Sequence, residues 1–141
     1  MTRHDAAITT WSQWVKRVFR GGHAFAEGAF LHGASDERYN IRQTRSAVLW
    51  GIAMPISVML ITLLAVLADA RMSLLLTIPI LAWLLLAYRI YRHSRLRGRQ
   101  PRLCLMETMF CILAKTPEAC GVIRFWTNQR AGRRSKLIEY K

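Results

Sequence analysis

The chain has 141 residues, of which 52% are hydrophobic, and a formal net charge of +13. This length suits one small domain rather than two. Apolar and charged residues are segregated, since residues 46–68 and 72–88 carry no charge while Lys and Arg crowd the flanks. Charges are expelled from hydrocarbon and collect at its edges, so this pattern favours a membrane protein over a well-mixed soluble domain.

Residues 1–45 contain an amphipathic stretch that begins after Thr10, a suitable helix N-cap. We expect a helix from there to about Arg20, ended by Gly21-Gly22. Its apolar stripe would consist of Trp11, Trp14, Val15, Val18 and Phe19, opposite Ser12, Gln13, Lys16, Arg17 and Arg20. Such a stripe suits a helix in the interface of an anionic membrane, and equally a helix packed on a separate soluble domain.

A second short helix is expected over residues 23–31. His23 and Glu27 are four residues apart and would share one face of it. A structural or solvated pair is the more common role for such residues than catalysis or metal binding. The segment 35–38 has the composition of a cap that opens a juxtamembrane helix leading into the first apolar run.

The two uncharged runs predict a transmembrane hairpin. As helices, residues 46–68 would extend about 34 Å and residues 72–88 about 25 Å, close to the ~30 Å of a bilayer core. The turn 69–71 is so short that the helices must be antiparallel neighbours. Pro55 and Pro79 are more often tolerated kinks in such helices than functional hinges.

The distribution of Lys and Arg predicts the orientation of this hairpin. Residues 1–45 hold seven of these residues, the turn holds one and residues 89–141 hold thirteen. Because positive charge stays on the cytoplasmic side, both termini should be cytoplasmic and the turn periplasmic. We therefore expect a multi-pass protein of the bacterial inner membrane.

The region 89–141 opens with a basic stretch, which we expect to contact anionic lipid at the inner surface. Nucleic acid is the less favoured partner, because no recognition module accompanies the charge. The stretch contains Arg89, Arg92, Arg95, Arg97, Arg99 and Arg102.

Residues 103–114 are apolar, too short to cross a bilayer and interrupted by Glu107. They predict an interfacial, re-entrant or tucked helix. Thr116, Pro117 and Glu118 then supply a cap, a first-turn proline and a first-turn acid for a last helix to about Arg130.

The chain offers no recognisable catalytic chemistry. Cys104, Cys111 and Cys120 lack metal-ligand spacing and are expected to be reduced, partly buried thiols. There is no Gly-rich phosphate loop, metal-ligand cluster or nucleophile with an adjacent base in the sequence. We therefore expect no metal or cofactor in this chain, and an all-α membrane protein: a two-helix transmembrane hairpin with amphipathic interfacial helices on the cytoplasmic side.

Five segments on the flanks of the two apolar runs form a recognisable series. They are RHDAAIT at 3–9, WSQWVKR at 11–17, RGGHAFAEG at 20–28, KTPEACGVIRF at 115–125 and LIEYK at 137–141. In order and spacing they resemble the membrane region that follows the catalytic core in bacterial family-2 glycosyltransferases.

The resemblance implies a function in envelope polysaccharide or glycolipid synthesis. A complete enzyme of the family uses a divalent metal, a nucleotide sugar and a DxD motif, whereas this chain has no DxD and is too short to hold that domain. We expect a membrane-anchoring, acceptor-side C-terminal segment that is inactive alone. Its partners would be membrane lipids, a separate catalytic domain and a lipid-linked acceptor. The alternative is a stand-alone inner-membrane protein, structural or regulatory, of a polysaccharide-assembly complex.

Some family members carry a QxxRW motif on an interfacial helix beside the acceptor site, and residues 13–17 are similar with the order changed. By this resemblance Trp14 would stack on an acceptor sugar, and Lys16 or Arg17 would meet a diphosphate. The alternative is that these residues only seat a helix among the headgroups. The acceptor- or lipid-facing candidates are Trp11, Trp14, Lys16, Arg17, Arg20 and His23.

Overall fold

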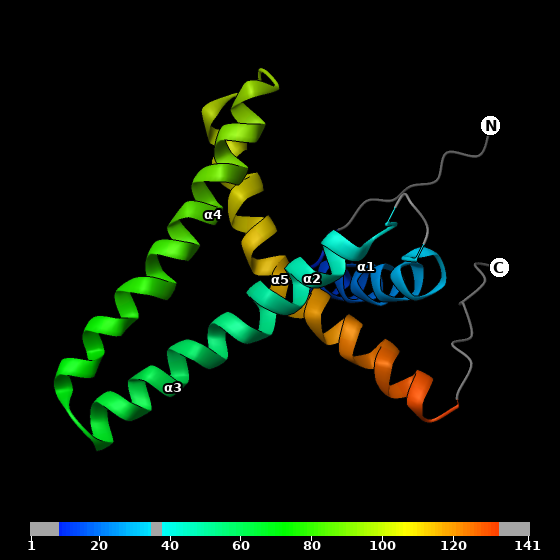
Figure 1. Cartoon of the computed structure of the whole chain (residues 1–141). Coiled ribbons are helices and arrows are strands. Elements are labelled where there is room, and N and C mark those ends of the chain that lie inside the picture. The colour runs from blue at the N-terminus through cyan, green and yellow to red at the C-terminus, as the bar shows by residue number, and fades with distance from the viewer. Residues whose placement is uncertain (1–8, 35–37, 133–141) are drawn as a thin grey trace, which may run out of the picture. The chain divides into compact units, whose positions relative to one another are not determined.

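The computed structural model describes residues 9–34 and 38–132, and every regular element in these ranges is a helix, as the sequence predicts (Figure 1). The chain divides into two compact units. The first unit combines residues 1–45 with 117–141, and the second comprises residues 46–116. The cap expected at 35–38 falls largely outside the described residues.

The first unit contains helix α1, Trp11–His32, which begins at the expected residue. Thr10 forms a capping box, in which its hydroxyl accepts from the Gln13 N–H at 3.4 Å. In return the Gln13 side-chain oxygen accepts from the Thr10 N–H at 3.3 Å. These bonds satisfy donors that a helix start otherwise leaves unpaired, so the predicted N-cap is confirmed.

The predicted helix end at Gly21-Gly22 is wrong, because α1 continues to His32 and includes the segment expected as a separate helix. A Cβ atom added at Gly22 would overlap the carbonyl group of Glu118, on helix α5 (Pro101–Arg130). A Cβ atom at Gly121 would likewise overlap the carbonyl oxygen of Phe19. The glycines therefore permit close approach of two helices, which outweighs their low helix propensity.

The core of the first unit lies beside this crossing. Ala26, Ala119, Val122 and Phe125 are buried. The Phe125 ring meets His23 edge-on, with ring centroids 5.4 Å apart. Small residues at the crossing and an aromatic ring next to it thus hold α1 against the second half of α5.

The second unit contains most of the first long apolar helix, Ile41–Leu67. It is composed of α2 (Ile41–Val48), the π-helical segment η1 (Leu49–Ala53) and α3 (Met54–Leu67). The Met54 N–H bonds the carbonyl of Leu49, five residues earlier. Pro55 follows at once, and a proline crowds the carbonyl four residues before it. The widened turn is therefore located where the proline disturbs α-helical bonding.

The second apolar helix, Arg71–Leu96, follows after a turn at Ala68 and Asp69. It consists of the 3-10 segment η2 (Ala70–Leu76), from Arg71 onward, and all of α4 (Thr77–Leu96). Asp69 caps its start by accepting from the Arg71 N–H at 2.9 Å. Both apolar helices extend beyond the predicted runs 46–68 and 72–88 into their basic flanks. Each is long and apolar enough, by length and composition, to cross a membrane.

Helix α5 corrects a second prediction, because one helix covers both the apolar segment 103–114 and the expected last helix. Pro117 lies inside it rather than at a first turn. An interior proline costs about 3 kcal/mol. Packed residues on both sides offset this cost: Cys104 and Thr108 are buried before the proline, and Val122 and Phe125 after it.

Candidate functional site

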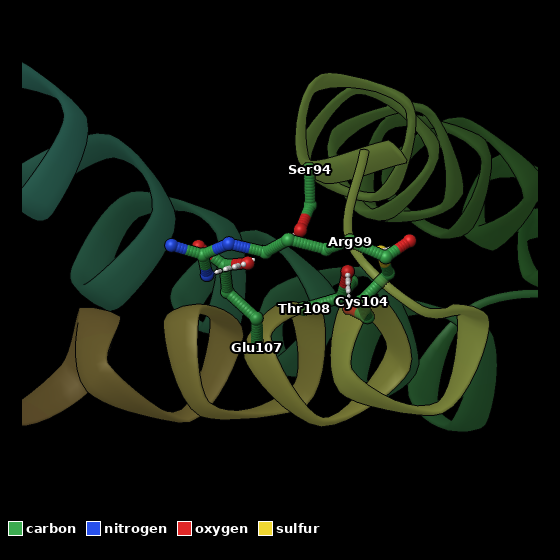
Figure 2. A network of polar contacts seen from close by, with 5 residues as sticks. All are labelled: Ser94, Arg99, Cys104, Glu107 and Thr108. Atoms are coloured by element: carbon green, nitrogen blue, oxygen red, sulfur yellow. Dashed lines mark hydrogen bonds and ion pairs between the residues drawn. The ribbon is translucent and has the colours of Figure 1, made fainter. Parts of the chain in front are cut away.

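A network of polar contacts in the second unit lies where α4 turns into α5 (Figure 2). Gly98, with φ of +76°, lets the chain leave α4, and Pro101 opens α5 at a position where its missing N–H is harmless. Ser94 near the end of α4 is only 2% exposed. This turn brings Ser94 to Glu107, thirteen residues later.

Glu107 is the centre of the cluster. Its Oε2 accepts from the Ser94 hydroxyl at 2.5 Å and from Nη1 of Arg99 at 2.7 Å. The Ser94 hydrogen bond and the Arg99 charge lower the pKa of Glu107 below its ordinary 4.5. Glu107 is therefore an ionised acceptor at neutral pH, and its charge is matched locally.

The remaining groups of the cluster are also engaged within it. The Arg99 carbonyl accepts from Nη1 of Arg95 at 2.8 Å and from the buried Cys104 thiol at 3.6 Å. Thr108 donates its hydroxyl to the Cys104 carbonyl at 2.7 Å. These hydrogen bonds and the ion pair connect the end of α4 to the start of α5, so the arrangement serves as a clamp that fastens the first half of α5 alongside α4.

The clamp separates the six predicted surface arginines into two groups. All six are exposed, but the side chains of Arg95 and Arg99 form hydrogen bonds within the clamp, whereas those of Arg89, Arg92, Arg97 and Arg102 form none with the described residues. Sequence reasoning treated the six as equivalent. Glu107, the only acid between residues 89 and 117, was the available signal that some arginine would be bound internally.

The candidates on α1 are also divided by their surroundings. Trp11 and Trp14 stack on each other with centroids 4.6 Å apart, and Trp11 is 57% exposed. Lys16, Arg17 and Arg20 are exposed.

His23, by contrast, is turned toward the helix crossing. It packs against Phe125, and its Nδ1 lies 3.8 Å from Oε2 of Glu27. The expected shared face of His23 and Glu27 is therefore present. Lys16 and Arg17 are therefore exposed to solvent, while His23 is partly covered.

A groove of about 330 Å³ lies between α3, α4 and the first half of α5. Its lining presents only apolar atoms, so it suits hydrocarbon and offers no group for acid–base or metal chemistry. The lining residues are Val58, Pro79, Ile80, Trp83, Leu84, Ala87 and Ile112.

Among the described residues, no three His, Cys, Asp or Glu side chains are grouped so that they could hold a metal ion. No disulfide joins the three cysteines, which all lie on α5; Cys104 is buried and Cys120 exposed. No family model, curated protein or solved structure matches this chain.

Proposed function

We propose that the chain is a membrane protein that crosses the bilayer twice and keeps both basic ends in the cytoplasm. The observation that carries this proposal is the exposure of the two apolar helices. In the most apolar 18-residue stretch of each helix, only 11% and 6% of the residues, respectively, are buried within the chain. A core helix of a soluble protein would be mostly buried, whereas these side chains need an apolar surrounding from outside.

The charge distribution supports the orientation. The turn between the helices carries one basic residue, Arg71, while the flanks before and after the hairpin carry seven and thirteen basic residues. Cytoplasmic loops carry such an excess of Lys and Arg. In the bacterial inner membrane this distribution supports a periplasmic turn.

The first half of α5 belongs in this arrangement to the cytoplasmic interface. Its large apolar side chains are exposed although the clamp holds it alongside α4. An apolar helical segment beside a membrane-spanning helix suits the boundary between headgroups and acyl chains. The exposed residues are Leu103, Leu105, Met106, Met109, Phe110 and Leu113.

The function proposed for this membrane protein is that of the acceptor-side anchor of a family-2 glycosyltransferase. The sequence resemblance on both sides of the hairpin supports it. Stacked Trp11 and Trp14, with exposed Arg17 one helical turn after Trp14, also suit an acceptor that combines sugar rings with a diphosphate. The chain would hold a separate catalytic domain at the inner leaflet and present a lipid-linked acceptor to it.

The test is to co-express the full chain with a separate nucleotide-sugar-binding catalytic domain and to measure sugar transfer in membranes. We expect the two proteins to co-purify and transfer to appear only when both are present. Absence of both association and transfer, with the chain inserted normally, would contradict the anchor function and favour a stand-alone structural or regulatory role.

A pair of variants sharpens this test. Trp14→Ala with Arg17→Ala should lower transfer at least tenfold without changing membrane insertion. The matched control is Trp126→Ala with Arg124→Ala, which also removes one tryptophan and one exposed arginine, but at the contact of Trp126 with Phe30 and Phe125. An equal loss in both double variants would assign the effect to general weakening of the first unit.

A further inference from the structure

One face of α4 is apolar, exposed and continuous with two arginines. Ile78, Leu81, Leu85 and Tyr88 are 64%, 58%, 62% and 60% exposed. Their spacings of three, four and three residues place them in one line along the helix. Arg89 and Arg92 continue that line at the next turn, and both are exposed. We refer to these six residues as the outer face of α4.

The other side of α4 is occupied by the protein itself. Ser94 bonds Glu107 on α5, and Trp83 and Ala87 line the apolar groove with Val58 of α3. By helical geometry these residues lie roughly opposite the outer face. The outer face is therefore covered neither by the clamp nor by the residues that line the groove.

Arg89 and Arg92 also differ from the neighbouring arginines in their partners. Arg95 and Arg99 are engaged in the clamp. For Arg89 and Arg92, no hydrogen bond or ion pair to another residue occurs within the described part of the chain. Two guanidinium groups three residues apart and without an acid thus lie at the end of an apolar stripe.

The length of the stripe matches one leaflet of a bilayer. From Ile78 to Tyr88 the helix rises about 15 Å, half of the ~30 Å hydrocarbon core. A phospholipid acyl chain occupies one leaflet, whereas a much longer polyisoprenyl chain would extend past the stripe. Tyr88 lies at the junction of apolar and charged residues, where aromatic side chains prefer the membrane interface.

We propose that the outer face of α4 binds one anionic phospholipid of the cytoplasmic leaflet; this rests on the membrane insertion proposed above. The acyl chain lies along Ile78, Leu81 and Leu85. The phosphate accepts hydrogen bonds from Arg89 and Arg92, which complement its charge. Anionic lipid is preferred over zwitterionic lipid, because no acidic group in the described chain neutralises this arginine pair.

Native mass spectrometry of the full chain in detergent, with equimolar phosphatidylglycerol and phosphatidylcholine, tests this proposal. We expect preferential retention of one phosphatidylglycerol molecule. Replacing both arginines, Arg89→Gln and Arg92→Gln, should reduce that preference by about fivefold for each arginine. The matched control, Arg97→Gln with Arg102→Gln, removes the same charge elsewhere and should keep the preference within twofold.

A second variant separates the chain-binding stripe from the headgroup site. Leu81→Ser with Leu85→Ser should weaken retention of both lipids without changing their ratio. An unchanged preference in Arg89→Gln with Arg92→Gln would overturn the proposal. So would displacement of phosphatidylglycerol by an equimolar polyisoprenyl phosphate, or a lipid-free dimer in which a second copy covers the face.

Alkaline extraction of membranes from cells that express the chain distinguishes failure of this lipid site from failure of the proposed function. A chain that resists extraction but shows no lipid preference would overturn the lipid site alone. A chain that is extracted would overturn the membrane insertion and, with it, the lipid site.

Discussion

The two units of the chain satisfy their apolar side chains in opposite ways. In the first unit, α1 and α5 approach closely enough at Gly22 and Gly121 that neither position has room for a Cβ atom, and Phe125 is 4% exposed. In the second unit, α3 contains no buried residue at all. The first unit is thus held by contacts within the chain, while the second presents its apolar surface outward. This difference supports the proposal that the second unit is the part of the chain that depends on lipid.

The largest expected effect is a charge in the apolar helix of the second unit. Leu60→Arg places a guanidinium near the middle of the run 46–68, and we expect it to disfavour insertion by about 3 kcal/mol. The fraction of chain resistant to alkaline extraction measures this. The control is Leu96→Arg, which also replaces an exposed leucine but lies among the arginines that follow the second apolar run, 72–88. Equal insertion of both variants would contradict the contrast between the units.

A smaller effect is expected at the helix crossing of the first unit. Gly22→Ala forces a methyl group onto the Glu118 carbonyl and should destabilise the folded chain by about 2 kcal/mol. Gly21→Ala is the matched control, because nothing lies within 4 Å of a Cβ atom there. Gly21→Ala should stabilise by about 1 kcal/mol, as expected for alanine in place of glycine in a helix. Thermal unfolding in detergent, followed by circular dichroism, measures both; a shift of the same sign for the two variants would refute the close crossing.

The contrast between Gly21 and Gly22 also explains which parts of the fold can be predicted from the sequence. Local signals sufficed for the Thr10 cap and for the two long apolar helices, since capping and hydropathy depend on nearby residues. The helix end predicted at Gly21-Gly22 and the helix start predicted at Pro117 are wrong, because distant contacts override local preference. At Gly22, the backbone of Glu118, which is distant in the sequence, lies where a Cβ atom would be.

The clamp was missed for a related reason. The sequence places Arg95 and Arg99 in the same basic stretch as Arg89 and Arg92, and charge alone does not distinguish them. Their separation depends on the turn at Gly98, which folds Glu107 back onto Ser94. The apolar stripe of α1 can be predicted from the sequence. The contact of His23 with Phe125 cannot, because it depends on where α1 crosses α5.

The smallest effect concerns the pH dependence of the clamp. The pKa of Glu107 is lowered in the folded chain, by the Ser94 hydrogen bond first and by the Arg99 charge. A lowered pKa means that Glu107 stabilises the folded chain above its ordinary pKa of 4.5, and that this contribution is lost as the pH falls through the lowered value.

Glu107→Gln should remove this part of the pH dependence while keeping an oxygen that Ser94 can reach. The measurement is the unfolding midpoint from pH 7 downward for the native chain and the variant. The two curves should differ at neutral pH and converge in acid. Curves that stay parallel throughout would show that the carboxylate does not act in this way.

The central claim is that both basic ends lie on one side of a membrane and the short turn on the other. Reporter fusions at residue 1, within the turn at residue 69 and at residue 141 test it directly in bacterial cells. Cytoplasmic activity at residues 1 and 141, with periplasmic activity at residue 69, is the predicted result. Termini on opposite faces, or a chain that stays in water without detergent, would contradict the account.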